Sequence, residues 1–273
     1  MEKKKILFIS QEIFPFLPKS EISGSARRIS QAVQDAGKEI RVFTPRFGAI
    51  NERRHQLHEV IRLSGLNISI DDHDHPLIIK VASISAARMQ VYFIDNDDYF
   101  KRKTCLQEED GKYHPDNDER AMFFCRGVLE TVKKLGWQPD VIHCHGWLTG
   151  IMALYIKFIF SKDPHFKETK VVYSLYNETF DQPWDPRFAE KLAFDGFPQD
   201  LTDALKDTSC ENLTKVILSH CDGVNIASET LAPNLQALYD EANILKLPYF
   251  AEEHQGKELA AFFDKVIDAN VLA

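Results

Sequence analysis

The chain has 273 residues, of which 44% are hydrophobic, 27% charged and 11% aromatic, the composition of an ordinary globular protein. Its 12 glycines and 12 prolines follow no period, which excludes collagen-like and low-complexity proteins. The formal net charge is −8, from 33 basic and 41 acidic residues. This balance argues against a broad phosphate-binding face, so we expect no nucleic-acid partner.

The cysteines and the apolar segments predict a reduced, cytoplasmic protein with no membrane partner. The 5 cysteines form no CxxC pair and are odd in number, so neither a zinc ribbon nor a disulfide framework is indicated. The apolar run after Lys5 is too short for a signal peptide. The stretch from Gly150 to Phe160 is interrupted by Lys157 and is too short to span a bilayer.

Strand-like and helix-like segments alternate from the start of the chain. Residues 6–9 form a continuous apolar run, typical of a strand buried on both faces. A helix pattern runs from Gly24 to Ala36 with Gly37 as its stop, and residues 40–43 form a second strand that Pro45 ends. Strand, helix and strand make a βαβ unit, which predicts parallel pairing with a right-handed crossover.

The middle of the chain predicts an antiparallel meander at one edge, because residues 68–70, 77–84 and 90–94 are strand-like and joined by short polar turns. The α/β alternation then returns. The predicted helices are 117–135, 148–160, 202–221 and 229–241, and the predicted strands are 140–144, 170–175 and 223–227. The tail from Glu252 to Ala269 has apolar residues at helical spacing.

We therefore expect an α/β fold with one Rossmann-like domain over residues 1–245, which has a mostly parallel sheet and an antiparallel β insertion. Residues 246–273 are expected to add a C-terminal amphipathic helix that packs on this domain.

Ligands of open parallel sheets bind beyond the carboxyl ends of the strands. The loops there are expected at 10–25, 95–117, 145–149 and 176–183. The first loop has one glycine, Gly24, and neither a dinucleotide fingerprint nor a P-loop, so no cofactor is expected. Gly24 either leaves backbone amides free for an anion or belongs only to the N-cap region of its helix.

Motifs in these loops follow the pattern of one family. Residues 11–15 read QEIFP, 19–24 read KSEISG, 93–95 read FID with Tyr99 close behind, 116–120 read DNDER, and 139–150 read PDVIHCHGWLTG. Over about Lys5 to Tyr239 the chain resembles the N-terminal catalytic half of bacterial glycogen and starch synthases. These are retaining glucosyltransferases of the two-domain GT-B class that use ADP-glucose. The 139–150 string, which the family has as Pro-Asp-Val-Val-His-x-His-Asp-Trp-His-x-Gly, is the most specific.

The resemblance implies the GT-B N-terminal-half fold and a glucan acceptor, since that half mainly holds the acceptor in the family. It implies catalytic positions at Lys19 and Tyr176, the latter at the position of the family's active-site His. The implied substrate-binding residues are Glu12, Tyr99, Asn117, Arg120, His145, Trp147 and Asn177. The alternative interpretation is that Trp147 packs at the start of its helix and that Arg120 pairs with Asp116.

The chain also departs from the family pattern. Tyr176 stands where the family has His, Gly146 where it has Asp, and Leu148 where it has the second His. Glu21 and Ile22 replace the paired glycines beside Lys19. Because glycines there let the backbone approach the donor's phosphates, Glu21 adds a repelling charge instead.

The family places a nucleotide-binding domain after this one, and we expect the chain to end about where that domain would begin. One hydrogen-bond donor that stabilises charge in the transition state raises the rate by a factor of ~10²–10³. One acid or base group raises it by a factor of ~10²–10⁴. Whether the chain is an enzyme is thus open, and by itself we expect it to be inactive or weak. The expected partners are an α-glucan and, with a separate chain that supplies the missing half, ADP-glucose. The alternatives are a non-catalytic glucan-binding or regulatory subunit and an interaction domain. A homo-oligomer is another way to cover the open half-cleft.

Two other segments carry metal-ligand residue types. His143 and His145 lie on one face of a strand end, where they are either half a metal site or structural histidines hydrogen-bonded in the sheet. Residues 71–75 read DDHDH and suit many divalent ions, although Asp-rich turns are common for backbone reasons. We favour the structural interpretation of both and predict no metal site. No Gly-x-Ser-x-Gly supports a nucleophilic serine.

Overall fold

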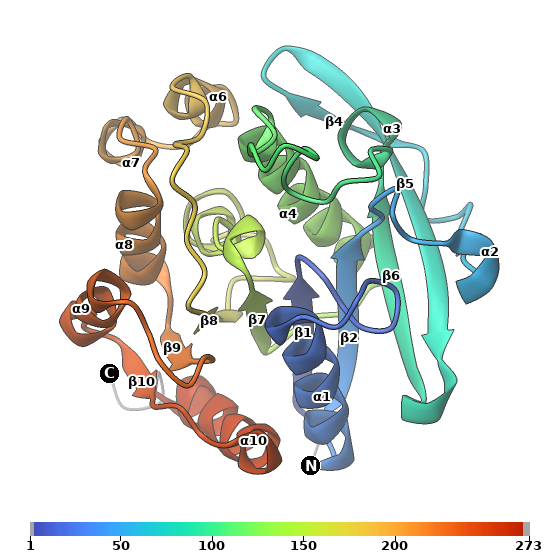
Figure 1. Cartoon of the computed structure of the whole chain (residues 1–273), viewed down its shortest axis with the longest axis vertical. Coiled ribbons are helices and arrows are strands. Elements are labelled where there is room, and N and C mark those ends of the chain that lie inside the picture. Colours follow the sequence, from blue (N-terminus) through green and yellow to red (C-terminus); the bar gives the residue numbers. More distant parts are fainter. Residues whose placement is uncertain (1–2, 270–273) are drawn as a thin grey trace.

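A mostly parallel sheet of 10 strands organises the molecule (Figure 1). The computed structural model describes residues 3–269. The strands are β1 (Lys5–Ser10), β2 (Glu39–Pro45), β3 (His58–Glu59), β4 (Leu66–Ile70), β5 (His73–Ile84), β6 (Met89–Asp95), β7 (Val141–His145), β8 (Lys170–Leu175), β9 (Gly223–Ile226) and β10 (Leu245–Leu247). Their order is β10-β9-β8-β7-β1-β2-β6-β5-β3, with β4 paired to β5.

Neighbouring strands from β10 to β6 pair in parallel, whereas β5 pairs antiparallel with β3, β4 and β6. The predicted α/β fold with an antiparallel insertion is therefore confirmed. The central strand β1 is apolar and buried on both faces, because Ile6, Leu7, Phe8 and Ile9 are each 0–1% exposed.

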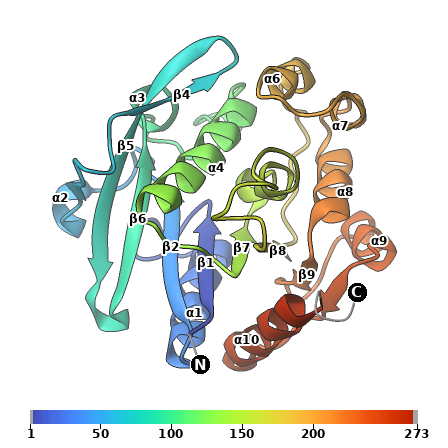
Figure 2. The same cartoon turned by 180° about the vertical axis from the view of Figure 1, so that it is seen from behind.

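Helices cover both faces of the sheet. They are α1 (Glu21–Asp35), α2 (Glu52–His55), η1 (Ser85–Ala87), α3 (Asp97–Phe100), α4 (Asn117–Lys134), η2 (Trp147–Thr149), α5 (Met152–Leu154), η3 (Tyr155–Ile159), α6 (Phe188–Phe194), α7 (Gln199–Ala204), α8 (Cys210–His220), α9 (Pro233–Glu241) and α10 (Glu252–Asp268). Figure 1 shows α1 in front of β1 and β2, and Figure 2 shows α4 in front of the opposite face. No helix in the described part of the chain is long and apolar enough to cross a membrane.

Three of the predicted helices differ in the structure. The helix expected over 202–221 is two helices, α7 and α8, because Asp207 accepts the Ser209 N–H and Ser209 then caps α8 by accepting the Asn212 N–H. The helix expected from residue 229 begins at Pro233, a residue favoured in the first turn. The segment expected as one helix over 148–160 is a succession of 3₁₀, α and π turns.

Helix α10 packs against α1 and the sheet (Figures 1 and 2). A Cβ built on Gly256 would lie 2.2 Å from the Cβ of Ala32, so the two helices touch at backbone distance. Lys38 Nζ lies 2.6 Å from Asp264 Oδ1 beside this contact. The apolar stripe of α10 is buried and consists of Leu259, Phe262, Phe263 and Val266. The predicted segments 1–245 and 246–273 include residues 1–2 and 270–273, which lie outside the described residues.

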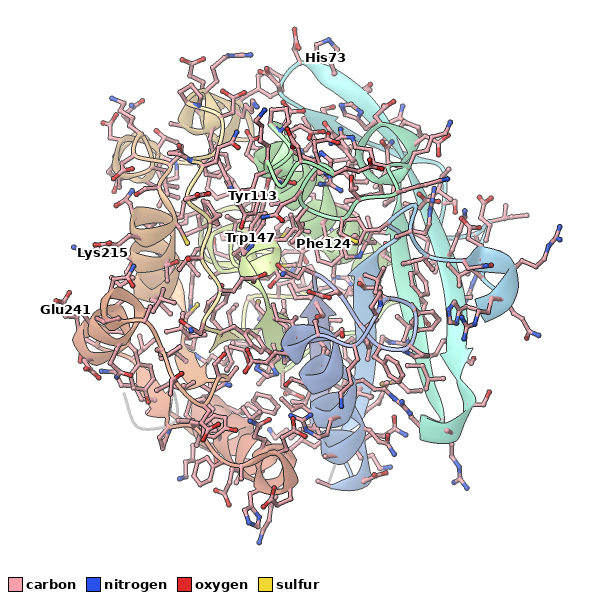
Figure 3. The ribbon with its side chains drawn as sticks, viewed as in Figure 1. His73, Tyr113, Phe124, Trp147, Lys215 and Glu241 are labelled. Carbon is pink, nitrogen blue, oxygen red and sulfur yellow. The ribbon has the colours of Figure 1, made fainter. Side chains whose placement is uncertain are left out.

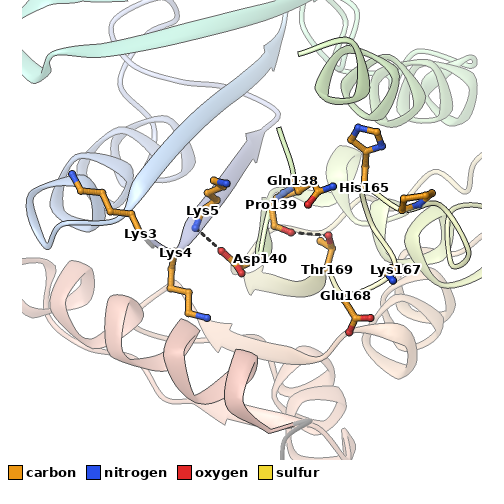
Figure 4. A pocket seen from close by; sticks show the side chains of 11 residues that line it. Lys3, Lys4, Lys5, Gln138, Pro139, Asp140, His165, Lys167, Glu168 and Thr169 are labelled. Carbon is orange, nitrogen blue, oxygen red and sulfur yellow. Dashed lines mark hydrogen bonds between the residues drawn. The ribbon is translucent and has the colours of Figure 1, made fainter. Parts of the chain in front are cut away.

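A cavity of about 270 Å³ lies at the amino edge of the sheet (Figure 4). Its walls include Lys3, Lys4, Asp140 and Glu168. The Lys5 N–H donates to Asp140 Oδ2 at 2.7 Å, which joins the starts of β1 and β7. This cavity is at the opposite edge of the sheet from the loops in which the candidate site residues lie.

Candidate functional site

The carboxyl ends of four neighbouring strands bring the candidate loops together. The register places Ser10 of β1 beside His145 of β7, and His145 beside Ser174 of β8. The Gln11 N–H continues the pairing by donating to the His145 carbonyl at 3.0 Å, and the Ala227 N–H donates to the Leu175 carbonyl at 2.9 Å. Residues that follow β1, β7, β8 and β9 therefore share one edge.

A chain of hydrogen bonds runs through the buried side chains at this edge. His145 Nδ1 lies 2.7 Å from the Tyr176 hydroxyl, and His145 Nε2 lies 3.1 Å from His143 Nδ1. His143 Nε2 lies 2.8 Å from Ser174 Oγ and 3.1 Å from Asn225 Oδ1. Burial lowers the pKa of His143 to about 3 and holds the pKa of His145 well below its usual range, so both rings are neutral.

The chemistry of its members fixes the direction of this chain. Asn225 Oδ1 can only accept, and it also accepts a hydrogen bond from the Ser174 hydroxyl at 2.9 Å. His143 Nε2 therefore carries the ring N–H and donates to it. A neutral ring has one N–H; His143 Nδ1 therefore accepts from His145 Nε2–H, and His145 Nδ1 accepts from the Tyr176 O–H. All four ring nitrogens are engaged, as the structural interpretation of the two histidines expects.

The turn after β7 brings Gln11, Gly146 and Glu178 together. Gly146 has φ +86°, and a Cβ built there would lie 2.2 Å from Gln11 Cδ. Gln11 Nε2 donates to the two carboxylate oxygens of Glu178 at 2.9 and 3.1 Å. Burial raises the pKa of Glu178 to about 7, against the Gln11 hydrogen bond, and the nearby Glu12 raises it further. No sequence motif singles out Glu178, and its one signal is its place next to Asn177 in a candidate loop.

The loop after β1 holds Glu12 and Lys19. The Ser20 hydroxyl donates to Glu12 Oε2 at 2.9 Å, and burial raises the pKa of Glu12. Lys19 is exposed, and its Cε lies 3.4 Å from the Cβ position of Gly24. Beside it, a groove of about 690 Å³ follows α1 and is lined by Lys19, Gly24, Arg27, Arg28 and Glu252 among others. Lys19 is thus one of the basic residues that line this groove.

Asn177 joins the loops after β8 and β9. Its N–H donates to Ser228 Oγ at 2.8 Å, and its Oδ1 accepts the Ala232 N–H at 2.9 Å. The Ser228 hydroxyl in turn donates to Glu21 Oε2 at 2.8 Å. The predicted binding residue Asn177 is exposed, but its amide oxygen is already in use as an acceptor.

Trp147 lies in an aromatic cluster next to these loops. Its ring centroid is 5.0 Å from that of Phe180, 5.8 Å from Trp184 and 6.0 Å from Tyr113, which Figure 3 shows beside it. The Tyr113 hydroxyl donates to the Thr179 carbonyl at 3.2 Å. Trp147 is only 5% exposed, so the ring has no free face for a sugar in this conformation. Its role in glucan binding stays a prediction.

Tyr99, Asn117 and Arg120 form an internal group between α3 and α4. Arg120 is 0% exposed; its Nε donates to the Tyr99 carbonyl at 2.8 Å and its Nη1 to Asn117 Oδ1 at 2.7 Å. Burial lowers the pKa of Arg120 to about 10. The Asp116 carboxylate forms its salt bridge with Arg102 rather than with Arg120. These contacts support the loop from within, and direct contact of the three residues with substrate also stays a prediction.

One cluster of carboxyl groups has the geometry of a cation site. Asp118, Glu119 and Asp185 place their oxygens close together, and Lys191 Nζ lies 2.7, 2.7 and 2.8 Å from them. The ammonium group therefore supplies the positive charge there. In the segment 71–75, Asp71 binds Arg187 at 2.9 Å.

This fold and this edge define the class of the protein: an α/β domain of the GT-B glycosyltransferase type. A family model described as starch synthase catalytic domain matches residues 5–247. The chain therefore belongs to the starch synthase catalytic-domain family, as the sequence motifs indicate.

Sequence and structure comparisons agree. The chain is 36% identical over 202 residues to a glycogen synthase of Chlorobaculum tepidum, and the aligned region covers 70% of this chain and 41% of that protein. It is 30% identical over 255 residues to a glycogen synthase of Pelodictyon phaeoclathratiforme, and the aligned region covers 93% of this chain and 51% of that protein. The catalytic domain of starch synthase IV from Arabidopsis thaliana has a similar fold, with a TM-score of 0.70 at 16% identity over 91% of this chain and 52% of that one. The chain spans about half the length of the curated relatives it matches.

Proposed function

We propose that this chain binds an α-1,4-glucan at the carboxyl edge of its sheet and that, by itself, it transfers glucose from ADP-glucose weakly or not at all. Family membership supports the choice of polymer and donor. Glu12, Asn177 and Glu178 keep part of their surface in water at this edge, and carboxylate and amide groups are suited to sugar hydroxyls.

The observation that carries the weak-transfer part is the hydrogen bond between Tyr176 and His145. Tyr176 stands at the position of the family's active-site His, and its hydroxyl proton is directed to His145 Nδ1 at 2.7 Å. A phenol whose proton is held in this way does not replace an imidazole as a donor to the reacting sugar. Loss of one preorganised donor costs ~10²–10³ in rate.

Charge at the edge supports the same conclusion. The charges of Glu12 and Glu21 both raise the pKa of Glu178, whereas Lys19 is the basic residue of the first loop. A diphosphate close to three carboxylates is repelled. We therefore infer that efficient use of ADP-glucose requires donor-binding groups beyond these residues, which a partner chain can supply.

Two assays test this function. Affinity electrophoresis in gels containing glycogen should retard the purified chain, and a radiolabelled ADP-glucose assay should give transfer at least about 100-fold below that of a full-length glycogen synthase. Unretarded migration would refute glucan binding, and turnover near that of the full-length enzyme would refute weak transfer.

Addition of a separately produced C-terminal half of a glycogen synthase distinguishes the remaining roles. Stimulated transfer supports a catalytic half that needs a partner chain. Retardation by glycogen without stimulation supports a non-catalytic glucan-binding or regulatory role. If the chain shows no retardation and no stimulation, the interaction domain is supported.

A further inference from the structure

The side chain of Gln11 packs against Gly146 at the position where any other residue would have its Cβ. Gly146 has φ +86°, and any Cβ at this position would lie 2.2 to 2.5 Å from three side-chain atoms of Gln11, far inside van der Waals contact. The motif of the resembled family has Asp at the position of Gly146. The Gln11 side chain therefore occupies space that a side chain at position 146 would need.

The Gln11 carboxamide uses this position to hold a carboxylate. Gln11 Oε1 accepts the Leu148 N–H at 3.3 Å, which fixes the orientation of the amide. Gln11 Nε2 then donates to both oxygens of Glu178 at 2.9 and 3.1 Å. Glu178 is thus held over the turn at 146–148, where the family motif carries its own carboxylate.

We propose that Glu178, positioned by Gln11, is the carboxylate that binds hydroxyl groups of the glucan in this chain, in place of a side chain at Gly146. This inference rests on the glucan binding proposed above. A carboxylate has about four acceptor positions, and the Gln11 amide does not use all of them. Since Glu178 keeps part of its surface in water, an acceptor position is left for a ligand.

The surroundings select the chemical class of the ligand. The titratable groups that interact electrostatically with Glu178 include Glu12 after β1, Glu21 on α1, Tyr113, Tyr173 on β8, Tyr176 after β8 and Cys210 on α8. Each is acidic or neutral, so an anionic ligand is repelled while a neutral polyol that donates hydrogen bonds is accepted. Burial and the two neighbouring carboxylates also raise the pKa of Glu178 to about 7, so the strongest acceptor form develops as the pH rises through neutrality.

The experiment is calorimetric titration of the full chain with maltoheptaose between pH 5.5 and 8. For the wild type we expect affinity to increase with pH through about 7. Glu178→Gln keeps the shape and removes the charge; it should weaken binding at pH 8 by about tenfold or more, since hydrogen bonds to charged groups contribute ~1.5–3 kcal/mol. The pH dependence should disappear in this variant. The matched control is Glu229→Gln, an exposed carboxylate in the loop after β9.

The outcomes separate the two proposals. If the wild type binds maltoheptaose and Glu178→Gln binds equally with the same pH profile, the role of Glu178 is refuted while glucan binding stands. If the wild type binds at no pH, both proposals fail. Circular dichroism of each variant shows whether it is folded, and Glu178→Asp, which keeps the charge and shortens the side chain, should retain the pH dependence with weaker binding.

Discussion

The Tyr176 hydroxyl donates its proton to His145 Nδ1 at 2.7 Å, and the ring of His145 donates onward to His143 at 3.1 Å. The residue that distinguishes this chain from its family at that position is thereby part of a buried network that links β7, β8 and β9.

Replacement of Tyr176 by Phe should destabilise the fold. It leaves His145 Nδ1 without its donor in a fully buried site, and an unsatisfied buried polar group costs about 1–3 kcal/mol. Urea denaturation followed by circular dichroism measures the free energy of unfolding. Tyr249→Phe, whose hydroxyl has no partner among the described residues, is the control; equal stability of the two variants would contradict the network.

Gly256→Ala should weaken the docking of α10 on α1. The added methyl group would overlap the Cβ of Ala32 at 2.2 Å, and overpacking of this kind costs about 1–3 kcal/mol. Ala32→Gly alone should cost about 1 kcal/mol through helix propensity. The double variant should recover part of the loss, because the two positions are in contact. If the two single changes in the free energy of unfolding, measured by urea denaturation, simply add in the double variant, the helices do not meet there.

Lys191→Met should create a site for divalent cations. Removal of the ammonium leaves Asp118, Glu119 and Asp185 facing one another, and removal of one partner from a buried ion pair costs about 3–5 kcal/mol. The melting temperature of this variant should therefore rise with millimolar calcium, while the wild type and the exposed control Lys215→Met should not respond. A variant as stable as the wild type, or one indifferent to calcium, would be inconsistent with the cluster.

Glu178 should also alter the pH dependence of stability. Its pKa is raised from 4.5 to about 7 in the folded chain, so between these values the folded state binds more protons and stability falls as pH rises. The side chain is partly exposed, so we expect this loss between pH 5 and 8 to be about 1–2 kcal/mol. The low pKa of His143 acts in the opposite direction, since it costs stability as pH falls below 6.5.

The comparison of wild type with Glu178→Gln isolates this contribution, because both proteins contain the same histidines. The difference between their free energies of unfolding should shift in favour of the variant from pH 5 to pH 8, as measured by urea denaturation. A difference that does not change with pH would contradict the raised pKa.

Periodicity and motif spacing predicted most of the fold. The continuous apolar run at 6–9 identified a strand of the sheet interior, since such a run fits a strand covered on both faces. The break between α7 and α8 was missed, because the hydrogen bonds of Asp207 and Ser209 interrupt a pattern that is apolar enough to continue. Strands as short as β3 and β10 have too few residues to show a period.

The candidate site was less predictable. The loops were located correctly at the carboxyl edge, but which side chains reach water there depends on contacts between distant segments. Phe180 and Trp184 cover Trp147, and Tyr99 accepts a hydrogen bond from a fully buried Arg120. Glu178 gave no signal of its own, because its significance depends on Gln11, which is 167 positions away.

The sequence by itself determined the family and the order of strands and helices, since these depend on local patterns of apolar residues and on short motifs. Only the tertiary structure decided which polar side chains reach water at the carboxyl edge of the sheet and which are buried. Burial, hydrogen-bond direction and the pKa of a carboxyl group all depend on neighbours that the chain brings together only on folding.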